Sequence, residues 1–288
     1  MWCADNWSDY TLLDTSDGER LERWGKYTVV RPDPQVIWSG MKKCPEWKKP
    51  DARYSRKGGG GAWEENKLPQ NWKIGYENLG LVFEIRAMGF KHMGLFPEQA
   101  ANWEWFSELI KKAGRPIKVL NLFAYTGGAT VAAAKAGAAV THVDAAKGMV
   151  NQAKENARLC GLENAPIRYI VDDCRKFCER EMRRGNRYDA VIMDPPSYGR
   201  GPNGQVWKLE ECVCDLVSLT AGLLSDEPLF FLLNSYTTGL SASTMGYVLE
   251  TVIASKRGGK VYSDELGLRV KETGIPLPCG AASRWIAK

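Results

Sequence analysis

A regular alternation of strand-like and helix-like segments after residue 117 constrains the fold more than any other feature. Short apolar runs typical of buried strands are separated by longer segments with helical periodicity. Such alternation predicts a parallel sheet with helices on both faces. We expect strands at 117–122, 139–144, 167–171, 188–193 and 229–234, and helices at 129–136, 146–160, 176–184, 209–224 and 243–255. Late strands at 260–262 and 282–287 would add a hairpin to the sheet edge.

The first 90 or so residues have a different pattern, with short β-type stretches at 10–13, 27–30 and 81–85. Single domains commonly run to about 200–250 residues, so 288 residues suit one large domain with an appendage. We therefore expect a small β-rich module at 1–90 and a larger α/β domain at 91–288.

Basic and aromatic side chains are concentrated in this first module. Seven of the eleven tryptophans fall within residues 1–72, and segment 39–67 contains a glycine run at 58–61. We expect a mobile basic loop there. Basic groups interleaved with aromatic rings suit single-stranded nucleic acid. The same residues also suit a tryptophan core beside a solvated loop, and the sequence leaves both interpretations open. The basic residues are Lys42, Lys43, Lys48, Lys49, Arg53, Arg56, Lys57 and Lys67.

The composition is that of an ordinary globular protein, with 44% hydrophobic and 25% charged residues and a net charge of +5. No apolar run approaches the roughly 18 residues needed to span a bilayer. The start carries Asp5 and Asp9 and has neither the basic nor the apolar part of a secretory signal, so we expect a cytoplasmic protein. The eight cysteines form no CxxC pair and only two histidines occur, which disfavours a zinc site or a disulfide framework.

Three strand ends carry groups that suit a nucleoside cofactor. Gly127 and Gly128 follow the first strand, where backbone N–H groups can approach a ligand at a helix N-terminus. The spacing is not GxGxxG, which disfavours a dinucleotide. Asp144 ends the second strand and could accept hydrogen bonds from ribose hydroxyls, while Asp172 and Asp173 end the third and could meet an adenine amine. Tight turns and helix caps would explain any one of these residues but not all three ends.

The fourth strand ends in Asp194, Pro195 and Pro196, followed by Tyr198 and a glycine-rich loop. Each proline locks φ and removes a donor, so a carboxylate and a backbone carbonyl are held in one geometry. Both groups can accept hydrogen bonds from an amine, and a tyrosine can stack on a planar base. We predict that Asp194, Pro195 and Tyr198 are the catalytic residues, which bind and orient a planar, amine-bearing substrate beside the cofactor.

The stretches NLFAYTGGAT, THVDAAKGMVNQAKENA, VDD and DPPSYGRG resemble the class I S-adenosylmethionine-dependent methyltransferases. The nearest resemblance is to the large-subunit rRNA methyltransferase family that includes the cytosine carbon-5 enzymes. HMGLFPEQ at 92–99 is similar to the segment before that family's catalytic domain. The resemblance covers about residues 80–288. It implies an α/β, Rossmann-like seven-stranded methyltransferase sheet of order 3-2-1-4-5-7-6, with the last strand antiparallel.

The resemblance also implies S-adenosylmethionine as cofactor, RNA as partner, with methylation of ribosomal RNA as the activity, and a set of site residues. Phe123, Tyr125, Thr126 and Gly127 would line the methionine end of the cofactor. Asp144 would bind ribose, Asp173 would meet the adenine amine, and Asp194 would lie near the sulfonium. Phe96 and Gln99 would close the pocket, and the neighbours Asn121, Ala145 and Cys174 complete the set.

The chain departs from the cytosine carbon-5 enzymes at the catalytic cysteine. Methylation of cytosine carbon-5 needs a cysteine thiolate to attack the base. Neither residues 233–238 nor the segment directly after Asp194 contains a cysteine. Cys212, Cys214 and Cys279 lie elsewhere. We therefore predict direct in-line transfer to a nitrogen or another heteroatom, which needs no covalent adduct. A protein or small-molecule methyltransferase, and a non-catalytic cofactor-binding RNA assembly factor, stay open as alternatives, as does the oligomeric state.

Overall fold

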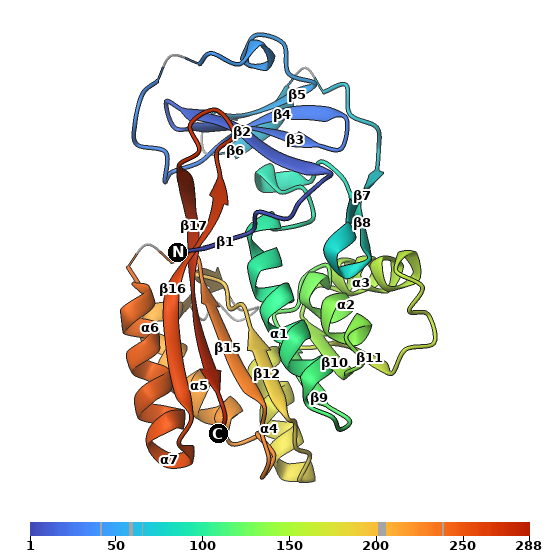
Figure 1. Ribbon diagram of the computed structural model, residues 1–288, viewed down its shortest axis with the longest axis vertical. Coiled ribbons are helices and arrows are strands. Elements are labelled where there is room, and N and C mark those ends of the chain that lie inside the picture. The colour runs from blue at the N-terminus through green and yellow to red at the C-terminus, as the bar shows by residue number, and fades with distance from the viewer. Residues whose placement is uncertain (41, 58–59, 65, 201–205, 238) are drawn as a thin grey trace. The chain divides into compact units, whose positions relative to one another are not determined.

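The computed structural model describes residues 1–288 except 41, 58–59, 65, 201–205 and 238, and the chain divides into two compact units (Figure 1). The first unit comprises Met1–Ala101 with Leu266–Cys279, and the second comprises Asn102–Glu265 with Gly280–Lys288. The division of the sequence at residue 90 stays a prediction. No helix within the described ranges is long and apolar enough to cross a bilayer.

The second unit is built on a sheet of strand order β11-β10-β9-β12-β15-β17-β16. Numbered along the domain this order is 3-2-1-4-5-7-6, so the predicted topology is confirmed. β17 runs antiparallel to β15, as expected for the last strand, whereas the pairs among β9 to β12 and β15 are parallel. The bounds are β9 Lys118–Leu122, β10 Ala139–Asp144, β11 Ile167–Val171, β12 Ala190–Met193, β15 Phe230–Ser235, β16 Lys260–Arg269 and β17 Pro276–Ile286.

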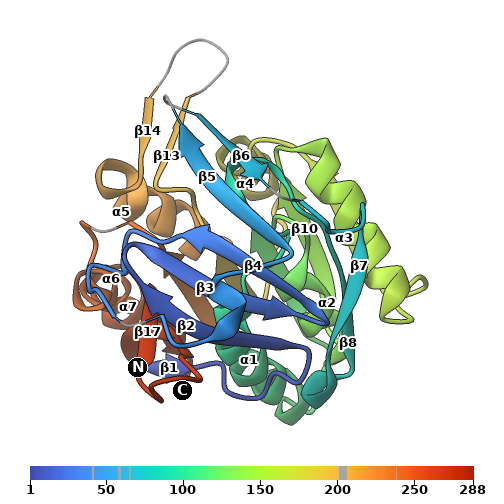
Figure 2. The same cartoon turned by 90° about the horizontal axis from the view of Figure 1, so that it is seen from above.

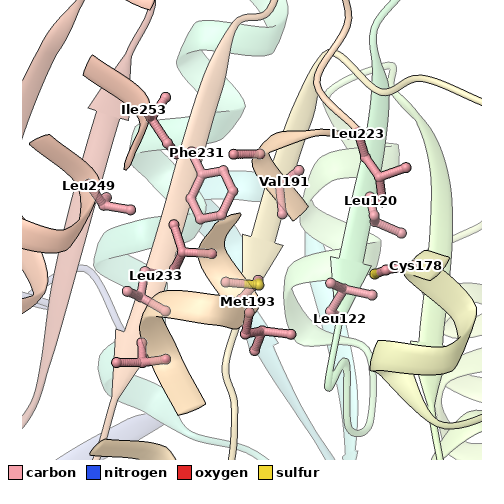
Figure 3. Close-up of a cluster of buried hydrophobic side chains, with 14 of the residues drawn as sticks. Leu120, Leu122, Cys178, Val191, Met193, Leu223, Phe231, Leu233, Leu249 and Ile253 are labelled. Carbon is pink, nitrogen blue, oxygen red and sulfur yellow. The ribbon is translucent and has the colours of Figure 1, made fainter. Parts of the chain in front are cut away.

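Helices cover both faces of this sheet. On one face, Phe106 of α1 stacks on Phe230 of β15 with ring centroids 5.9 Å apart. The opposite face packs against α4, α5 and α6 through alternate strand residues such as Leu120, Val191 and Phe231 (Figure 3). Burial of each of these apolar side chains stabilises the folded state by about 1.5–3 kcal/mol. The bounds are α1 Ala100–Lys112, α2 Gly128–Lys135, α3 Lys147–Leu159, α4 Cys174–Arg184, α5 Leu209–Ala221 and α6 Ala242–Leu249, continued by a π-helical turn Glu250–Ala254 and α7 Ser255–Arg257.

The late strands are much longer than the predicted 260–262 and 282–287. β16 and β17 are neighbours in the sheet, so backbone pairing continues through residues whose side chains gave no strand signal. The far part of this hairpin belongs to the first unit, where β1 (Trp2–Cys3) pairs with it in parallel at Leu266 and Gly267. A shorter hairpin, β13 (Tyr198–Arg200) with β14 (Val206–Lys208), extends beyond α5 in the second unit (Figure 2).

The first unit contains a five-stranded sheet of order β2-β3-β4-β5-β6 and a hairpin of β7 and β8. One face of the five-stranded sheet packs Leu13, Leu21 and Val30 against Trp47. The bounds are β2 Tyr10–Ser16, β3 Glu19–Trp24, β4 Tyr27–Pro32, β5 Ala52–Lys57, β6 Gly60–Glu64, β7 Trp72–Tyr76 and β8 Leu81–Ile85, with short helices η1 Pro45–Trp47, η2 Glu77–Leu79, η3 Gly89–Lys91 and η4 Pro97–Gln99.

The prediction of a mobile loop over 39–67 is wrong, because this segment contains η1 and the paired strands β5 and β6. Arg53 and Arg56 belong to β5, and glycines 58 and 59 of the predicted glycine run lie outside the described residues. Most tryptophans of the unit are packing residues. Trp24 is fully buried, and indole N–H groups donate hydrogen bonds in Trp7, Trp38, Trp47, Trp63 and Trp72. The basic side chains, more than the indoles, are thus the candidates for contact with nucleic acid.

Candidate active site

Three strand ends meet at one edge of the sheet in the second unit. β9 lies between β10 and β12, with Leu122 level with both Val143 and Met193. Because the three strands are parallel, the loop after β9, Asp144 at the end of β10 and Asp194 after β12 share the carboxyl edge. The Asp194 N–H donates to the Leu122 carbonyl at 3.4 Å. This edge is where open α/β sheets bind ligands.

The loop after β9 has an unusual backbone. Phe123 and Tyr125 have φ values of 54° and 50°, in the left-handed region that is strained for residues other than glycine. Each such residue costs about 1–3 kcal/mol, and the strain persists only where surrounding contacts hold it. The Tyr125 N–H donates to Oδ2 of Asp144 at 2.8 Å, and the Phe123 N–H donates to the sulfur of Cys174 at 3.2 Å. Strain held by such contacts is typical of a ligand-binding loop.

Helix α3 holds the end of the same loop. Gly127 has φ 82°, and a Cβ atom there would lie 2.7 Å from the Cβ of Ala153. Asn156, which is fully buried, donates from Nδ2 to the carbonyl of Thr126 at 2.8 Å. Gly127 is therefore required for close packing of the loop on α3, and Asn156 anchors the loop to that helix.

Asp144 is oriented for binding. Its Oδ2 accepts from Tyr125 N and its Oδ1 from Ala146 N, both at 2.8 Å. A carboxylate offers about four acceptor positions, and these two bonds use one position on each oxygen. The side chain is half-buried and the next residue, Ala145, is exposed. The arrangement fits a carboxylate that accepts hydrogen bonds from a pair of ligand hydroxyls.

Other predicted cofactor residues have structural contacts. Asp173 is the N-cap of α4, accepts from Lys176 N at 2.9 Å and is exposed. Burial raises the pKa of the Cys174 thiol, which disfavours its thiolate. Asn121 is buried and donates from Nδ2 to Thr130 Oγ1 at 2.9 Å. Their roles toward a cofactor stay predictions.

The segment after β12 is fixed by a tryptophan that the sequence reasoning missed. Trp207, on β14, donates from Nε1 to the Pro196 carbonyl at 2.7 Å, and its ring lies 6.2 Å from that of Phe123. The hairpin thus ties the Asp194 segment to the loop after β9. A lone tryptophan in a polar, glycine-rich stretch was the available signal.

Asp194, Pro195 and Tyr198 differ in exposure. Asp194 is half-buried, Pro195 is buried, and Tyr198 on β13 is 53% exposed. A ring this exposed to solvent could stack on a planar base. Residues 201–205 of the predicted glycine-rich loop lie outside the described residues.

Phe96 and Gln99 belong to the first unit, at the short helix η4. Phe96 is half-buried, with its ring 5.7 Å from that of His92, and Gln99 is buried. Their part in closing a cofactor pocket stays a prediction. In the described part of the chain, no group of three or more histidine, cysteine, aspartate or glutamate residues is arranged to hold a metal ion.

Comparisons with known proteins bear on this geometry. The sequence profile of the family described as S-adenosylmethionine-dependent methyltransferase matches residues 51–219, more than half of the chain. A crystal structure of a SAM-dependent methyltransferase from Agrobacterium tumefaciens superimposes with a TM-score of 0.92 and 39% identity, over 99% of this chain and 93% of that one. A protein from Streptococcus mutans, described as a candidate SAM-dependent methyltransferase, shares the fold, with a TM-score of 0.73 and 19% identity over 98% of this chain and 76% of that one.

Among curated relatives, ribosomal RNA large subunit methyltransferase K/L from Shewanella frigidimarina is 34% identical over 123 residues. The match covers 42% of this chain and 16% of that protein, so the chain spans only a small part of this relative's length. The family profile and the Agrobacterium structure together settle the family. The chain belongs to the S-adenosylmethionine-dependent methyltransferases, and S-adenosylmethionine is its cofactor.

Proposed function

We propose that this enzyme transfers a methyl group from S-adenosylmethionine directly to a nitrogen of a base in ribosomal RNA. One observation carries the proposal: Asp144 and Asp194 stand at the ends of the two strands that flank β9, on either side of the strained loop after β9. The likeness to a relative named as a ribosomal RNA methyltransferase supports RNA as the substrate. An enzyme acting on ribosomal RNA would work in the cytoplasm.

The residues of the edge fit the cofactor. Asp144, held by two backbone N–H groups, would accept hydrogen bonds from ribose hydroxyls, and the loop from Phe123 to Gly127 would surround the methionine end. Asp173 would meet the adenine amine from the end of β11. Bound S-adenosylmethionine supplies an electrophilic methyl group on a sulfonium centre.

Asp194 would orient the acceptor. A half-buried carboxylate can accept a hydrogen bond from an exocyclic amine, turn its lone pair toward the methyl group and take up or relay the released proton. The Pro195 carbonyl would be a second acceptor, since that of Pro196 is used by Trp207. Tyr198 would stack on a base turned out of its helix.

The thiols support nitrogen over carbon-5 of cytosine as the acceptor. Cys174 is the thiol that contacts the loop after β9, and burial raises its pKa, so it is a poor source of the thiolate that carbon-5 methylation needs. Cys212 and Cys214 lie along helix α5, and Cys279 belongs to the first unit.

The proposal is tested by incubating the purified protein with labelled S-adenosylmethionine and under-methylated ribosomal RNA, followed by nucleoside analysis. We expect label on a base nitrogen, with fully methylated RNA as the negative control. Label on carbon-5 of cytosine would contradict direct transfer and point to a displaced cysteine. If cofactor binding is confirmed but RNA takes up no label, the RNA substrate is wrong and proteins or small molecules become the candidates.

A further inference from the structure

Charged side chains are concentrated on one face of the five-stranded sheet in the first unit. Arg20 of β3 lies directly opposite Arg31 of β4, so both point to the same face, and Glu22 follows Arg20 two residues later on that face. β5 lies beside β4 in the register that puts Arg56 on this face too. The opposite face packs the apolar cluster under η1.

Glu22 and Arg31 form a complete structural pair. Glu22 is fully buried and accepts from Tyr10 Oη at 2.9 Å, from Arg31 Nε at 2.6 Å and from Arg31 Nη2 at 2.7 Å. The remaining Arg31 nitrogen, Nη1, donates to the Lys91 carbonyl at 2.8 Å. The charges and donors of this pair are therefore used within the unit.

Arg20 is less completely paired. It is 9% exposed, and its Nε has no hydrogen-bond partner among the residues that the structure describes. Its ion pairs are long, at 3.5 Å from Nε to Glu22 and 3.5 Å from Nη1 to Asp33. A buried guanidinium donor without a partner is unfavourable, typically by about 1–3 kcal/mol.

Lys91 lies at the more open side of the cluster. It is half-buried, and its Nζ donates to the Pro32 carbonyl at 2.8 Å. Burial and the nearby charges of Arg20, Arg31 and Arg56 lower the pKa of Lys91 to about 8, although Asp33 acts in the opposite direction. Lys91 therefore stands where positive charge is in excess.

Positive charge exceeds negative charge among the described residues of this cluster. Its cationic side chains, those of Arg20, Arg31, Arg56 and Lys91, meet the carboxylates of Glu22 and Asp33, and the pair of Glu22 and Arg31 is already neutral. Unbalanced charge away from water is unfavourable unless a counter-charge is present, so the cluster is suited to an anion. Guanidinium forks and an ammonium group are the groups that bind phosphate oxygens in proteins.

We propose that Arg20, Arg56 and Lys91 form a phosphate-binding site, and that its occupant is a backbone phosphodiester of the RNA substrate. Arg20 supplies a buried donor, Arg56 an exposed guanidinium and Lys91 a half-buried ammonium. The identity of the occupant rests on the proposed function, whereas the affinity for phosphate does not. Free phosphate is the other source of the same chemistry.

The first test is calorimetric titration with inorganic pyrophosphate at constant ionic strength, using the full chain and the variants Lys91→Gln and Arg56→Gln. Glutamine at 91 keeps a donor for Pro32, and Arg56 is exposed, so both variants should fold. The matched control is Lys73→Gln, which removes an exposed lysine from β7 of the same unit. We expect about tenfold weaker binding in each test variant and unchanged binding in the control. Equal affinity in all four proteins would overturn the site.

The second test separates the two sources of phosphate. Binding of a single-stranded RNA oligonucleotide is measured at several salt concentrations, and each test variant should lower the slope of log K against log salt concentration by about 1.

If the variants lose pyrophosphate binding but keep the wild-type salt dependence of RNA binding, the phosphodiester is the wrong occupant. If the wild type methylates RNA and the variants match it in both titrations, the site is wrong and the proposed function stands. If the wild type neither binds nor methylates RNA but the variants lose pyrophosphate binding, the function is wrong and the phosphate site stands.

Discussion

Glu22 in the first unit and Asp144 in the second unit carry the same chemical group in different surroundings. Glu22 lies in the middle of β3, is fully buried and accepts three hydrogen bonds from Tyr10 and Arg31. Asp144 lies at the end of β10, is half-buried and accepts from two backbone N–H groups of adjacent loops. The Glu22 carboxylate stabilises the fold through its hydrogen bonds within the unit. The Asp144 carboxylate is oriented by backbone N–H groups and can still accept hydrogen bonds from a ligand.

The position along the strand explains this difference. A residue in the middle of a sheet is covered by neighbouring strands and by the layer above, so its polar atoms must be satisfied within the protein. The carboxyl end of a parallel strand opens onto loops, where backbone N–H groups can hold an acid such as Asp144 or Asp194 without covering it. Substitutions of these acids and of the thiols on α5 test this comparison.

Asp194→Asn is expected to have the largest effect on function. Without the carboxylate the acceptor amine is not oriented and its proton is not taken up, so turnover should fall by about 10³-fold. Affinity for S-adenosylmethionine should stay nearly unchanged, because Asp144 is intact. Methyl transfer and calorimetry with the cofactor measure the two quantities. Asp215→Asn, an exposed acid on α5, is the control, and normal turnover of the Asp194 variant would refute the assigned role.

Glu22→Gln should have the largest effect on stability. Removing one partner of a buried ion pair typically costs about 3–5 kcal/mol of unfolding free energy, measurable by urea denaturation at neutral pH. Burial alone would raise the pKa of Glu22, but Arg20 and Arg31 outweigh it and hold the pKa at about 2, below the ordinary value of 4.5. The stabilisation is therefore complete above pH 4.5 and is lost as the pH falls through about 2.

The difference in unfolding free energy between wild type and Glu22→Gln should accordingly become smaller as the pH falls from 4.5 to about 2. Glu19→Gln is the matched control on the same strand, since Glu19 pairs with Arg53 and Lys42 at a partly exposed site. Such a pair is worth about 0–1 kcal/mol. Equal losses of unfolding free energy in Glu22→Gln and Glu19→Gln would show that burial does not determine whether a carboxylate stabilises the fold.

Asp144→Asn should have a smaller effect, confined to the cofactor. An amide oxygen can still accept one hydrogen bond, but the charge and the second acceptor oxygen are lost. We expect about tenfold weaker binding of S-adenosylmethionine, close to 1.4 kcal/mol, and a smaller loss of turnover at saturating cofactor. Calorimetric titration decides, and an unchanged affinity would remove Asp144 from the ribose site.

Cys214→Ser should have the smallest effect. The residue is exposed on α5, and direct transfer needs no thiolate, so turnover should stay within about twofold of wild type. The same holds for Cys212→Ser. Loss of activity in either variant, with the fold intact by circular dichroism, would restore a covalent mechanism and contradict methylation at nitrogen.

Local patterns in the sequence predict the elements of the second unit and the polar groups at their ends. The strands Ala139–Asp144 and Ile167–Val171 match the predicted ranges at both ends, because an apolar run that stops at an aspartate is a local signal. Family resemblance added the strand order and the residues that gather at the carboxyl edge. The positions of Asp144 and Asp194 beside the loop after β9 follow from these two sources together.

Contacts between separate segments of the chain, by contrast, are visible only in the folded structure. Trp207 donates to the Pro196 carbonyl 11 residues earlier, and Arg31 donates to the Lys91 carbonyl 60 residues away. Neither pairing can be read from the residues adjacent to the two partners. The same is true of β5 and of the full lengths of β16 and β17, which exist because their backbones pair with other strands. Strand pairing and buried charge depend on which surfaces meet on folding, whereas strand ends and turns depend on adjacent residues.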